Sequence, residues 1–422
     1  MASSKSSYAV DQAEALDETF LPSDKLAGRS CALLTPAARM DKVAYPIRDI
    51  VLKARQVQAT GIPMHWFNIG DPNKFDFAPP PWVTKAIVDA LGDSRFSAYA
   101  PSDGDPDLRE TIAKNEGIEP EKVFITSGLT EGLYFAFQCL LEPGQHILLP
   151  APTYPLYSTI SRMFDGDNTY YKSDAQWQPD IDDMRKRINS KTRAIVLINP
   201  NNPTGAVYPR STIKAVADLA GEHCLPLIAD EIYDKLVFGE PLTPVHKIAG
   251  ADIPVIRGNG LSKNFFYPGS RVGYLALHGP RLEKIIPDLN RLCNSRLSVN
   301  WEMQRGALAA FSQPPSHLPA ALVKLRARRD LMAKRLNNIP GIRTTTPQAA
   351  FYIFPEVTDG PWANDTEFIY DLMENTGIVG VPGSGFSPER EGRFFRLVYL
   401  AHEDEINAAM DKLEAFMKKR LA

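Results

Sequence analysis

Short apolar runs alternate with amphipathic segments along the middle of this chain, and this alternation limits the possible folds more than any other feature. Each apolar run is bounded by Gly, Pro or Asn, which is typical of buried parallel strands. The segments between them, such as 180–188 and 211–223, have helical periodicity. The sequence therefore predicts an α/β domain with a mainly parallel sheet. The expected strands are 122–126, 146–149, 194–198, 225–229 and 254–257.

The C-terminal part of the chain has a different pattern. A long charged helix is expected there, followed by short strand-like runs and a final helix. With 422 residues the chain exceeds the size at which one core usually divides. We predict an N-terminal arm over 1–30, a large domain over 81–315, and a small α+β domain formed by 31–80 and 316–422.

Composition excludes several classes of protein. The net charge is −3 and the basic residues are scattered, which argues against a nucleic-acid partner. The four cysteines show no CxxC spacing and the seven histidines no metal-ligand spacing, so we expect no disulfide framework and no metal site. No apolar run is long enough for a membrane span, and the acidic N-terminus lacks a secretory pattern. A cytoplasmic location is the expectation.

Polar residues follow several expected strands directly, where an open α/β sheet collects its ligands. The strand ending at Ile198 continues into Asn199–Gly205, in which two Asn-Pro pairs stiffen the loop. Such a loop can present an Asn side chain to a ligand, although a lone Asn-Pro is more often a simple turn. The whole seven-residue string favours the ligand-binding interpretation.

The strand ending at Ala229 continues into Asp230, Glu231, Ile232 and Tyr233. A carboxylate at the end of a buried strand is costly unless it is paired. A pyridinium N–H would be a suitable partner for Asp230, and Tyr233 could hydrogen-bond a phenolic oxygen on the same ring. Capping of the next helix by Asp230 is an equally good interpretation of this segment alone.

A lysine on a Gly-rich bend follows the last expected strand. The desolvated position and the neighbouring positive charge suit the amine of Lys263 to Schiff-base formation. Arg271 follows closely and could grip a phosphate through two hydrogen bonds. An ordinary solvated lysine is the alternative, which the surrounding segments disfavour.

The strand ending at Thr126 leads through Ser127-Gly128 into a helical pattern. Free backbone N–H groups at such a helix start attract phosphate. The segment matches neither GxGxxG nor a P-loop, so dinucleotide and ATP binding lose support.

Taken together and in this order, these segments resemble the class I aminotransferases, enzymes of fold type I that use pyridoxal phosphate (PLP). The resemblance begins near residue 38, and it is strongest to bacterial-type alanine aminotransferases. The matching strings are FNIGDP (67–72), YAPSDGDPDLR (99–109), TSGLTEGL (126–133), APTYPLY (151–157), INPNNPTGAVY (198–208), ADEIYDK (229–235), NGLSK (259–263), SRVGY (270–274) and RLVYL (396–400).

The resemblance implies a large domain with a mainly parallel seven-stranded sheet flanked by helices, and a PLP enzyme that exchanges amino groups between amino acids and 2-oxo acids. It also implies roles for individual residues. Lys263 would form the Schiff base and move the proton, and Asp230 would pair with the ring nitrogen. Asn202 and Tyr233 would bond the ring oxygen, and Tyr154 would stack on the ring. The phosphate would be bound by Leu129, Thr130, Ser262, Arg271 and, from the neighbouring subunit of a homodimer, Tyr99; the substrate carboxylate would be bound by Arg396, Asn202 and Gly70.

One position departs from the family pattern. Many members have Ser three residues before the lysine, where this chain has Gly260. One phosphate contact is then lost or supplied elsewhere, although Gly also occurs in the alanine branch. Alanine with 2-oxoglutarate in a ping-pong reaction is the first-choice activity. Aspartate, aromatic or branched substrates, a PLP β-lyase, and a non-catalytic PLP-sensing regulator are the alternatives.

Overall fold

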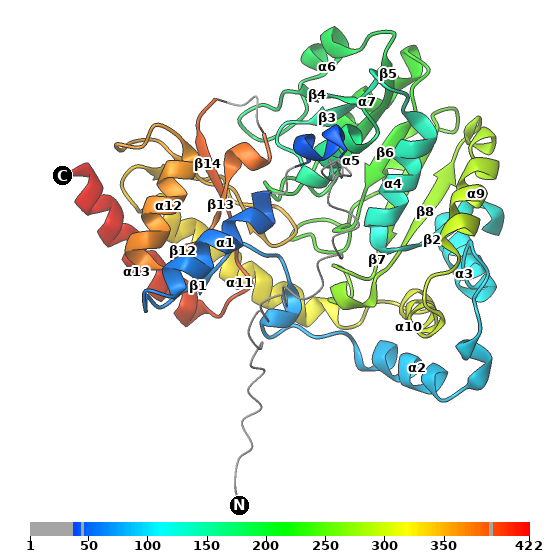
Figure 1. Ribbon diagram of the computed structural model, residues 1–422, viewed down its shortest axis with the longest axis horizontal. Helices are drawn as coiled ribbons and strands as arrows, with labels where there is room; N and C mark the ends of the chain where they lie inside the picture. Colours follow the sequence, from blue (N-terminus) through cyan, green and yellow to red (C-terminus); the bar gives the residue numbers. More distant parts are fainter. Residues whose placement is uncertain (1–36, 44–45, 388–390) are drawn as a thin grey trace, which may run out of the picture.

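The computed structural model describes residues 37–43, 46–387 and 391–422, so the arm expected over residues 1–30 lies outside the described residues. Figure 1 shows a larger body around β2 to β8 and a smaller body in which the early helix α1 lies beside the late helix α12. Among the described residues, no helix is both long and apolar enough to cross a lipid bilayer.

The larger body contains one seven-stranded sheet in the order β2-β8-β7-β6-β5-β3-β4. Strands β7, β6, β5, β3 and β4 pair in parallel, whereas β8 is antiparallel to both of its neighbours. This confirms the expected fold class. The strands are β2 (Val123–Ser127), β3 (His146–Pro150), β4 (Asp167–Tyr171), β5 (Thr192–Ile198), β6 (Leu227–Asp230), β7 (Val255–Gly260) and β8 (Val272–His278).

Two of these strands were not expected from the sequence. Strand β4 begins with an exposed residue and two partly buried polar residues, so it lacks a continuous apolar run. Strand β8 begins inside the SRVGY string (270–274), directly after Arg271, the residue predicted to bind phosphate. Strand β6 begins at Leu227 and not at Leu225, because Pro226 has no N–H for the ladder.

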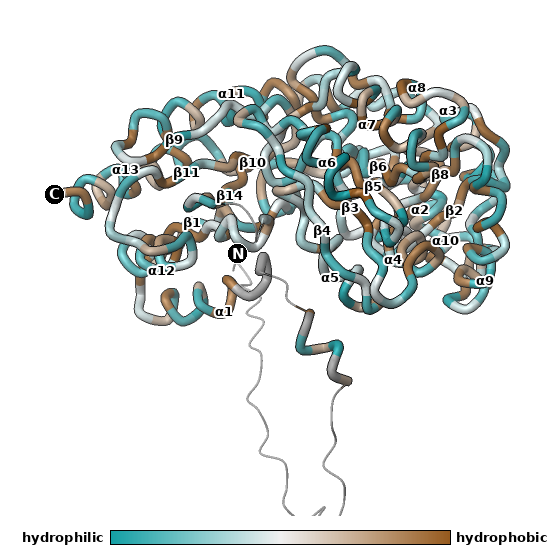
Figure 2. The backbone as a smooth tube through the Cα atoms, turned by 90° about the horizontal axis from the view of Figure 1, so that it is seen from above, coloured by the Kyte–Doolittle hydropathy of each residue, from teal (hydrophilic) through white to brown (hydrophobic). Residues whose placement is uncertain are grey.

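Helices cover both faces of the large sheet. Along β5, Val196 and Ile198 pack into the core cluster that contains α4 and α5, whereas Ile195 and Leu197 pack into the cluster that contains α6, α7 and α8. Both faces of the sheet are covered by helices and buried, which explains why the strands are continuous apolar runs. Figure 2 shows hydrophobic stretches along β3 and β5 inside this body. The helices are α2 (Pro81–Leu91), α3 (Pro106–Glu116), α4 (Gly128–Leu140), α5 (Pro155–Met163), α6 (Ile181–Arg187), α7 (Arg210–Glu222), α8 (Val245–Ala249), α9 (Ile286–Arg296) and α10 (Trp301–Phe311).

The smaller body is built on an antiparallel sheet in the order β10-β14-β11-β9, with β13 also paired to β14. A parallel pair of β1 and β12 ties an early segment to a late one. The expected α+β character is confirmed, whereas the exact domain boundaries remain a prediction. The elements are α1 (Pro46–Gln58), β1 (His65–Trp66), α11 (Leu318–Asn337), β9 (Ile342–Arg343), β10 (Tyr352–Ile353), β11 (Glu356–Val357), α12 (Asp365–Thr376), β12 (Ile378–Val379), β13 (Val381–Pro382), β14 (Arg393–Val398) and α13 (Glu403–Leu421).

A buried cluster of charges fastens the end of α3 to the large sheet. The guanidinium of Arg257, on β7, pairs with the carboxylates of Glu116, Glu231 and Asp234. Tyr274 donates a hydrogen bond of 2.7 Å to Glu116. Burial alone would raise the pKa of Glu116, but the Arg257 charge and its other partners outweigh burial and lower that pKa to about 2. Burial raises the pKa of Glu231 to about 7 despite Arg257.

We expect Arg257→Met to lower the free energy of unfolding by about 3–5 kcal/mol, because buried carboxylates lose their cation. In the unsubstituted chain the stabilisation from Glu116 is complete above its ordinary pKa of 4.5 and is lost as pH falls toward about 2. The cost of the substitution should therefore shrink in acid, where the abandoned carboxyl groups take up protons. Urea unfolding followed by circular dichroism at neutral and acidic pH measures this.

Arg343→Met is the matched control for that measurement. Arg343 pairs with Glu356 on the surface, where its side chain is 71% exposed. Loss of an exposed pair should cost less than about 1 kcal/mol. Equal losses for the two variants would contradict the view that Arg257 is the cation that compensates a buried group of acids.

Gly377 marks the point where α12 ends and β12 begins. Its φ is +76°, and its N–H caps the helix by donating to the Met373 carbonyl. The Gly377 carbonyl accepts a hydrogen bond of 2.8 Å from His65 N–H, at the start of the β1–β12 pair. A Cβ at this position would overlap the carbonyl oxygen of Pro63. The position therefore requires glycine for both its conformation and its close contact.

Gly377→Ala should destabilise the fold more than Gly117→Ala. Gly117 ends α3 with a similar φ of +74°, but a Cβ there would meet open space. The Gly117 substitution should cost about 1–2 kcal/mol for the left-handed conformation. The Gly377 substitution should add a further 1–3 kcal/mol or so for the forced backbone shift. Thermal midpoints that fall by the same amount would contradict the role assigned to the Pro63 contact.

Candidate active site

A cavity of about 510 Å³ opens where strands β5, β6 and β7 end. The parallel register aligns Ile198 with Asp230 and Asp230 with Gly258, so the loops after these strands meet at one edge of the sheet. All the site residues predicted from the sequence line the cavity except Tyr99. They are Gly70, Leu129, Thr130, Tyr154, Asn202, Asp230, Tyr233, Ser262, Lys263, Arg271 and Arg396.

Asp230 is the buried acid in the wall of the cavity and is only 6% exposed. Its carboxylate accepts a hydrogen bond of 2.8 Å from the Tyr157 hydroxyl and one of 3.1 Å from the Ile232 N–H. Burial raises the pKa of Asp230 to about 6, opposed by these two donors and by the charge of Lys263. The carboxylate can thus pair with a protonated ring nitrogen that enters the cavity.

One end of the cavity gathers groups that suit a phosphate. Helix α4 begins at Gly128, so the first N–H groups of this helix, including those of Leu129 and Thr130, have no partner within it. Arg271 lies beside this helix start and donates to the carbonyl oxygens of Pro268 at 3.1 Å and Ser127 at 3.4 Å. Backbone donors and a guanidinium together fit a dianion.

Lys263 reaches across the cavity from the bend after β7. Its Nζ donates a hydrogen bond of 2.8 Å to the carbonyl oxygen of Gly70. The same nitrogen lies 5.4 Å from the ring centre of Phe351 and 6.0 Å from that of Tyr233. The amine therefore stands between residues of the large sheet and residues of the smaller body.

Arg396 is only 1% exposed, and its side chain is fixed by hydrogen bonds and by aromatic rings. Its guanidinium donates to Asn202 Oδ1 at 3.0 Å and to the Asn68 carbonyl at 2.6 Å. The rings of Tyr352 and Phe386 lie on the guanidinium at 4.5 and 4.7 Å from their centres. This arrangement pre-organises the planar fork that binds carboxylates through two hydrogen bonds.

The sequence interpretation missed two tyrosines of the site. Tyr157, the last residue of the APTYPLY string, donates to Asp230 from the first turn of α5. Tyr352 lines the cavity, and its hydroxyl shares a hydrogen bond of 2.8 Å with that of Tyr233. Burial, reinforced by Tyr352, raises the pKa of Tyr233 well above its ordinary value. Tyr157 lies in the quoted APTYPLY string, but the partners of both tyrosines come from distant parts of the chain.

Tyr99 is the one predicted site residue that the fold leaves outside the cavity of its own chain. It is 82% exposed. Its expected contact with the neighbouring subunit stays a prediction.

The departure at Gly260 has a structural reason. A Cβ there would come within 2.7 Å of the Val272 carbonyl oxygen and 2.8 Å of Gly273 Cα. Strands β7 and β8 are too close at this point for a serine.

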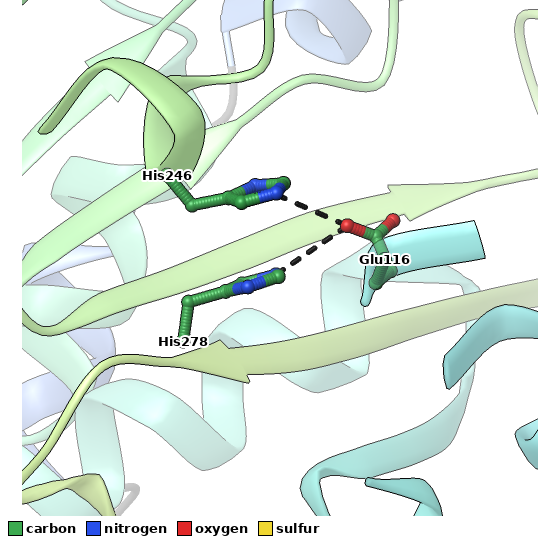
Figure 3. A group of neighbouring side chains, drawn as sticks. All are labelled: Glu116, His246 and His278. Atoms are coloured by element: carbon green, nitrogen blue, oxygen red, sulfur yellow. Dashed lines mark ion pairs between the residues drawn. The ribbon is translucent and has the colours of Figure 1, made fainter. Parts of the chain in front are cut away.

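A second group of potential ligands lies away from this cavity, at the buried charge cluster. Figure 3 shows the imidazoles of His246 and His278 stacked on each other beside Glu116. Their ring centres are 3.7 Å apart and their planes differ by 9°. A metal ion lies in the plane of each imidazole that binds it, so these parallel rings cannot share one ion as they stand. Sequence spacing did not predict this meeting of residues from three distant segments.

Comparisons with known proteins agree with this architecture. The chain is 31% identical over 402 residues to a glutamate-pyruvate aminotransferase of Escherichia coli, covering 90% of this chain and 97% of that protein. It is 32% identical over 397 residues to an alanine aminotransferase of Mycobacterium tuberculosis, with 90% and 92% covered.

Solved structures show the same fold. An alanine aminotransferase from Pyrococcus furiosus superposes with a TM-score of 0.89 at 41% identity, covering 92% of this chain and all of that one. An aspartate aminotransferase from Thermus thermophilus superposes with a TM-score of 0.82 at 28% identity, covering 91% of this chain and all of that one.

The family model described as aminotransferase class I and II matches residues 63–413, which include nearly all of the cavity and the strands that form it. Enzymes of this family are generally PLP-dependent transaminases. By sequence, fold and cavity, the chain belongs to the class I and II aminotransferases.

Proposed function

We propose that this chain is a PLP-dependent transaminase that exchanges the amino group of L-alanine with 2-oxoglutarate in a ping-pong reaction. The observation that carries the proposal is the arrangement of three features around one cavity. Asp230 lies in its wall, Lys263 reaches across it, and the start of α4 with Arg271 forms a phosphate cradle.

The residues present fit the cofactor. A buried carboxylate suits a pyridinium nitrogen, and the cradle suits the phosphate. Tyr154 and Ile232 also line the cavity and offer surfaces to an aromatic ring. Bound PLP would supply an aldehyde for the amino group and a protonated ring that stabilises the charge left after loss of the Cα proton.

The protein side chains then divide the work. Arg396 and Asn202 bind the substrate carboxylate through the guanidinium fork and the amide, which orients the Cα–H bond. Lys263 would hold the cofactor and, once its amine is free, would take the Cα proton and deliver it to the former aldehyde carbon of the cofactor, on the other side of the amino nitrogen. Asp230 keeps the ring nitrogen protonated. The same residues serve the second half-reaction in the reverse direction.

Alanine is the first-choice amino donor because of the proteins that the chain resembles. The relatives from E. coli and M. tuberculosis and the structure from P. furiosus carry names of alanine or glutamate-pyruvate aminotransferases. A screen of amino donors for this enzyme should include aspartate, because structures of aspartate aminotransferases superpose on this chain as well.

We infer that the working unit is a homodimer. Tyr99 is 82% exposed, and Leu91 and Val88 on nearby α2 are 64% and 65% exposed. Exposed apolar side chains that form a contiguous patch are typical of surfaces that a partner covers. In a dimer, Tyr99 would reach the phosphate of the neighbouring subunit. A cytoplasmic location stays a prediction from the sequence.

The proposal predicts that Lys263→Ala abolishes steady turnover of alanine and 2-oxoglutarate. Loss of both the covalent attachment and the proton-transfer group should lower kcat by at least about 10³-fold. The assay couples pyruvate formation to lactate dehydrogenase. Borohydride reduction of the cofactor-saturated protein should label a peptide that contains residue 263.

Lys214→Ala serves as the control because Lys214 pairs with Asp218 on exposed α7, with its side chain 53% exposed. It should retain turnover and labelling. A Lys263→Ala variant with unchanged rates, or a saturated protein without visible absorbance, would contradict the proposed function.

Arg396→Lys should lower kcat/KM for alanine by roughly 100-fold while cofactor affinity stays the same. Lysine keeps the charge but cannot make the two-pronged contact or stack between Tyr352 and Phe386. Steady-state kinetics and cofactor titration measure the two effects separately. Cofactor binding that weakens with unchanged KM would show that Arg396 does not bind substrate.

A further inference from the structure

We propose that Tyr157 is a positioning residue whose hydroxyl orients the Asp230 carboxylate and favours its ionised form, so that the bound ring nitrogen keeps its proton. The inference rests on the proposed function and extends it to a residue with no contact role of its own in that scheme. Tyr157 would act through Asp230 without touching the substrate.

The Tyr157 hydroxyl is placed to donate a hydrogen bond to Asp230. The side chain is completely buried, and its hydroxyl lies 2.8 Å from Asp230 Oδ2. A phenol has one hydrogen to donate, and here an acidic oxygen receives it. The ring is fixed by the packing of α5, with its centre 6.1 Å from that of Phe137. The hydroxyl position is therefore determined by packing that does not depend on the cavity contents.

The two oxygens of Asp230 have different donors. Oδ1 accepts from the Ile232 N–H at 3.1 Å and Oδ2 accepts from Tyr157. A carboxylate held at both oxygens cannot rotate freely, so its orientation in the wall of the cavity that it lines is fixed. Loss of the Tyr157 donor would therefore remove a hydrogen bond and also allow the Asp230 carboxylate to rotate.

The electrostatic surroundings of Asp230 show why this donor matters. Burial raises the pKa of Asp230, and the Tyr157 hydrogen bond is the strongest of the contacts that lower it, ahead of Ile232 and Lys263. Tyr154 and Tyr233 line the same cavity as Asp230. Burial also raises the pKa of Tyr157 well above its ordinary value, so its hydroxyl remains a donor.

The same hydrogen bond would affect the protonation of a ring nitrogen that pairs with Asp230. The pair shares one proton, which lies on nitrogen when the carboxylate is well stabilised and shifts toward oxygen when it is not. Without the Tyr157 donor, the Asp230 pKa rises and the ring nitrogen loses its proton at lower pH. A hydrogen bond to a charged group corresponds to roughly one pKa unit or more, a tenfold effect.

The test compares Tyr157→Phe with the unsubstituted protein, using pyridoxamine 5′-phosphate labelled with ¹⁵N in the ring. This probe cannot form a Schiff base with Lys263, so its binding reports the non-covalent contacts. Calorimetry gives its affinity, and the ¹⁵N chemical shift follows ring protonation across pH. We expect about tenfold weaker binding and loss of the ring proton roughly one pH unit lower. Asp230→Asn supplies the limiting case.

Tyr171→Phe is the matched control. Tyr171 is also completely buried. Its hydroxyl donates a hydrogen bond of 2.9 Å to the carbonyl oxygen of Val196, and neither residue lines the cavity. It should leave probe affinity and ring protonation unchanged. A Tyr157→Phe variant with the ¹⁵N titration of the unsubstituted protein, or equal affinity losses in both variants, would overturn the inference. If the unsubstituted protein bound neither PLP nor the probe, the proposed function itself would fail.

Discussion

The alignment of β5, β6 and β7 is the constraint on which the site depends. Parallel pairing sets Ile198, Asp230 and Gly258 side by side, so three loops from distant parts of the chain start at one edge of the sheet. Both faces of that sheet are dry, which leaves Asp230 buried at the strand end. A carboxylate in that position needs donors, and the fold provides them from α5 and from the turn after β6.

The smaller body completes what the sheet begins. Arg396 on β14 bonds to Asn202 from the loop after β5, and Tyr352 on β10 bonds to Tyr233 after β6. Lys263 in turn donates to the Gly70 carbonyl. The cavity is thus lined by residues of both bodies, with Asp230, Asn202 and Lys263 from the larger one and Tyr352 and Arg396 from the smaller one.

A separate set of charges lies next to the acid of the site. Glu231 follows Asp230 in sequence but bonds to Arg257, whose other partners include Glu116 at the end of α3. The turn after β6 is therefore anchored on one side by a buried ion cluster while Asp230 lines the cavity on the other. The stacked histidines beside Glu116 belong to this anchoring region (Figure 3).

Local pattern determined much of this protein. Apolar runs bounded by Gly, Pro and Asn marked the strands β2, β3, β5, β6 and β7, and the polar residues after them identified Asp230, Tyr233, Lys263 and Arg271, because the ends of parallel strands meet at one edge of a sheet. The family resemblance supplied the other predicted residues of the cavity lining. Tertiary structure alone decided the rest. The partners of Tyr157 and Tyr352, the crowding that excludes a side chain at Gly260, and the meeting of Glu116 with two histidines all depend on contacts between residues far apart in sequence. Such contacts leave no periodic signal in the chain, since packing geometry and not spacing creates them.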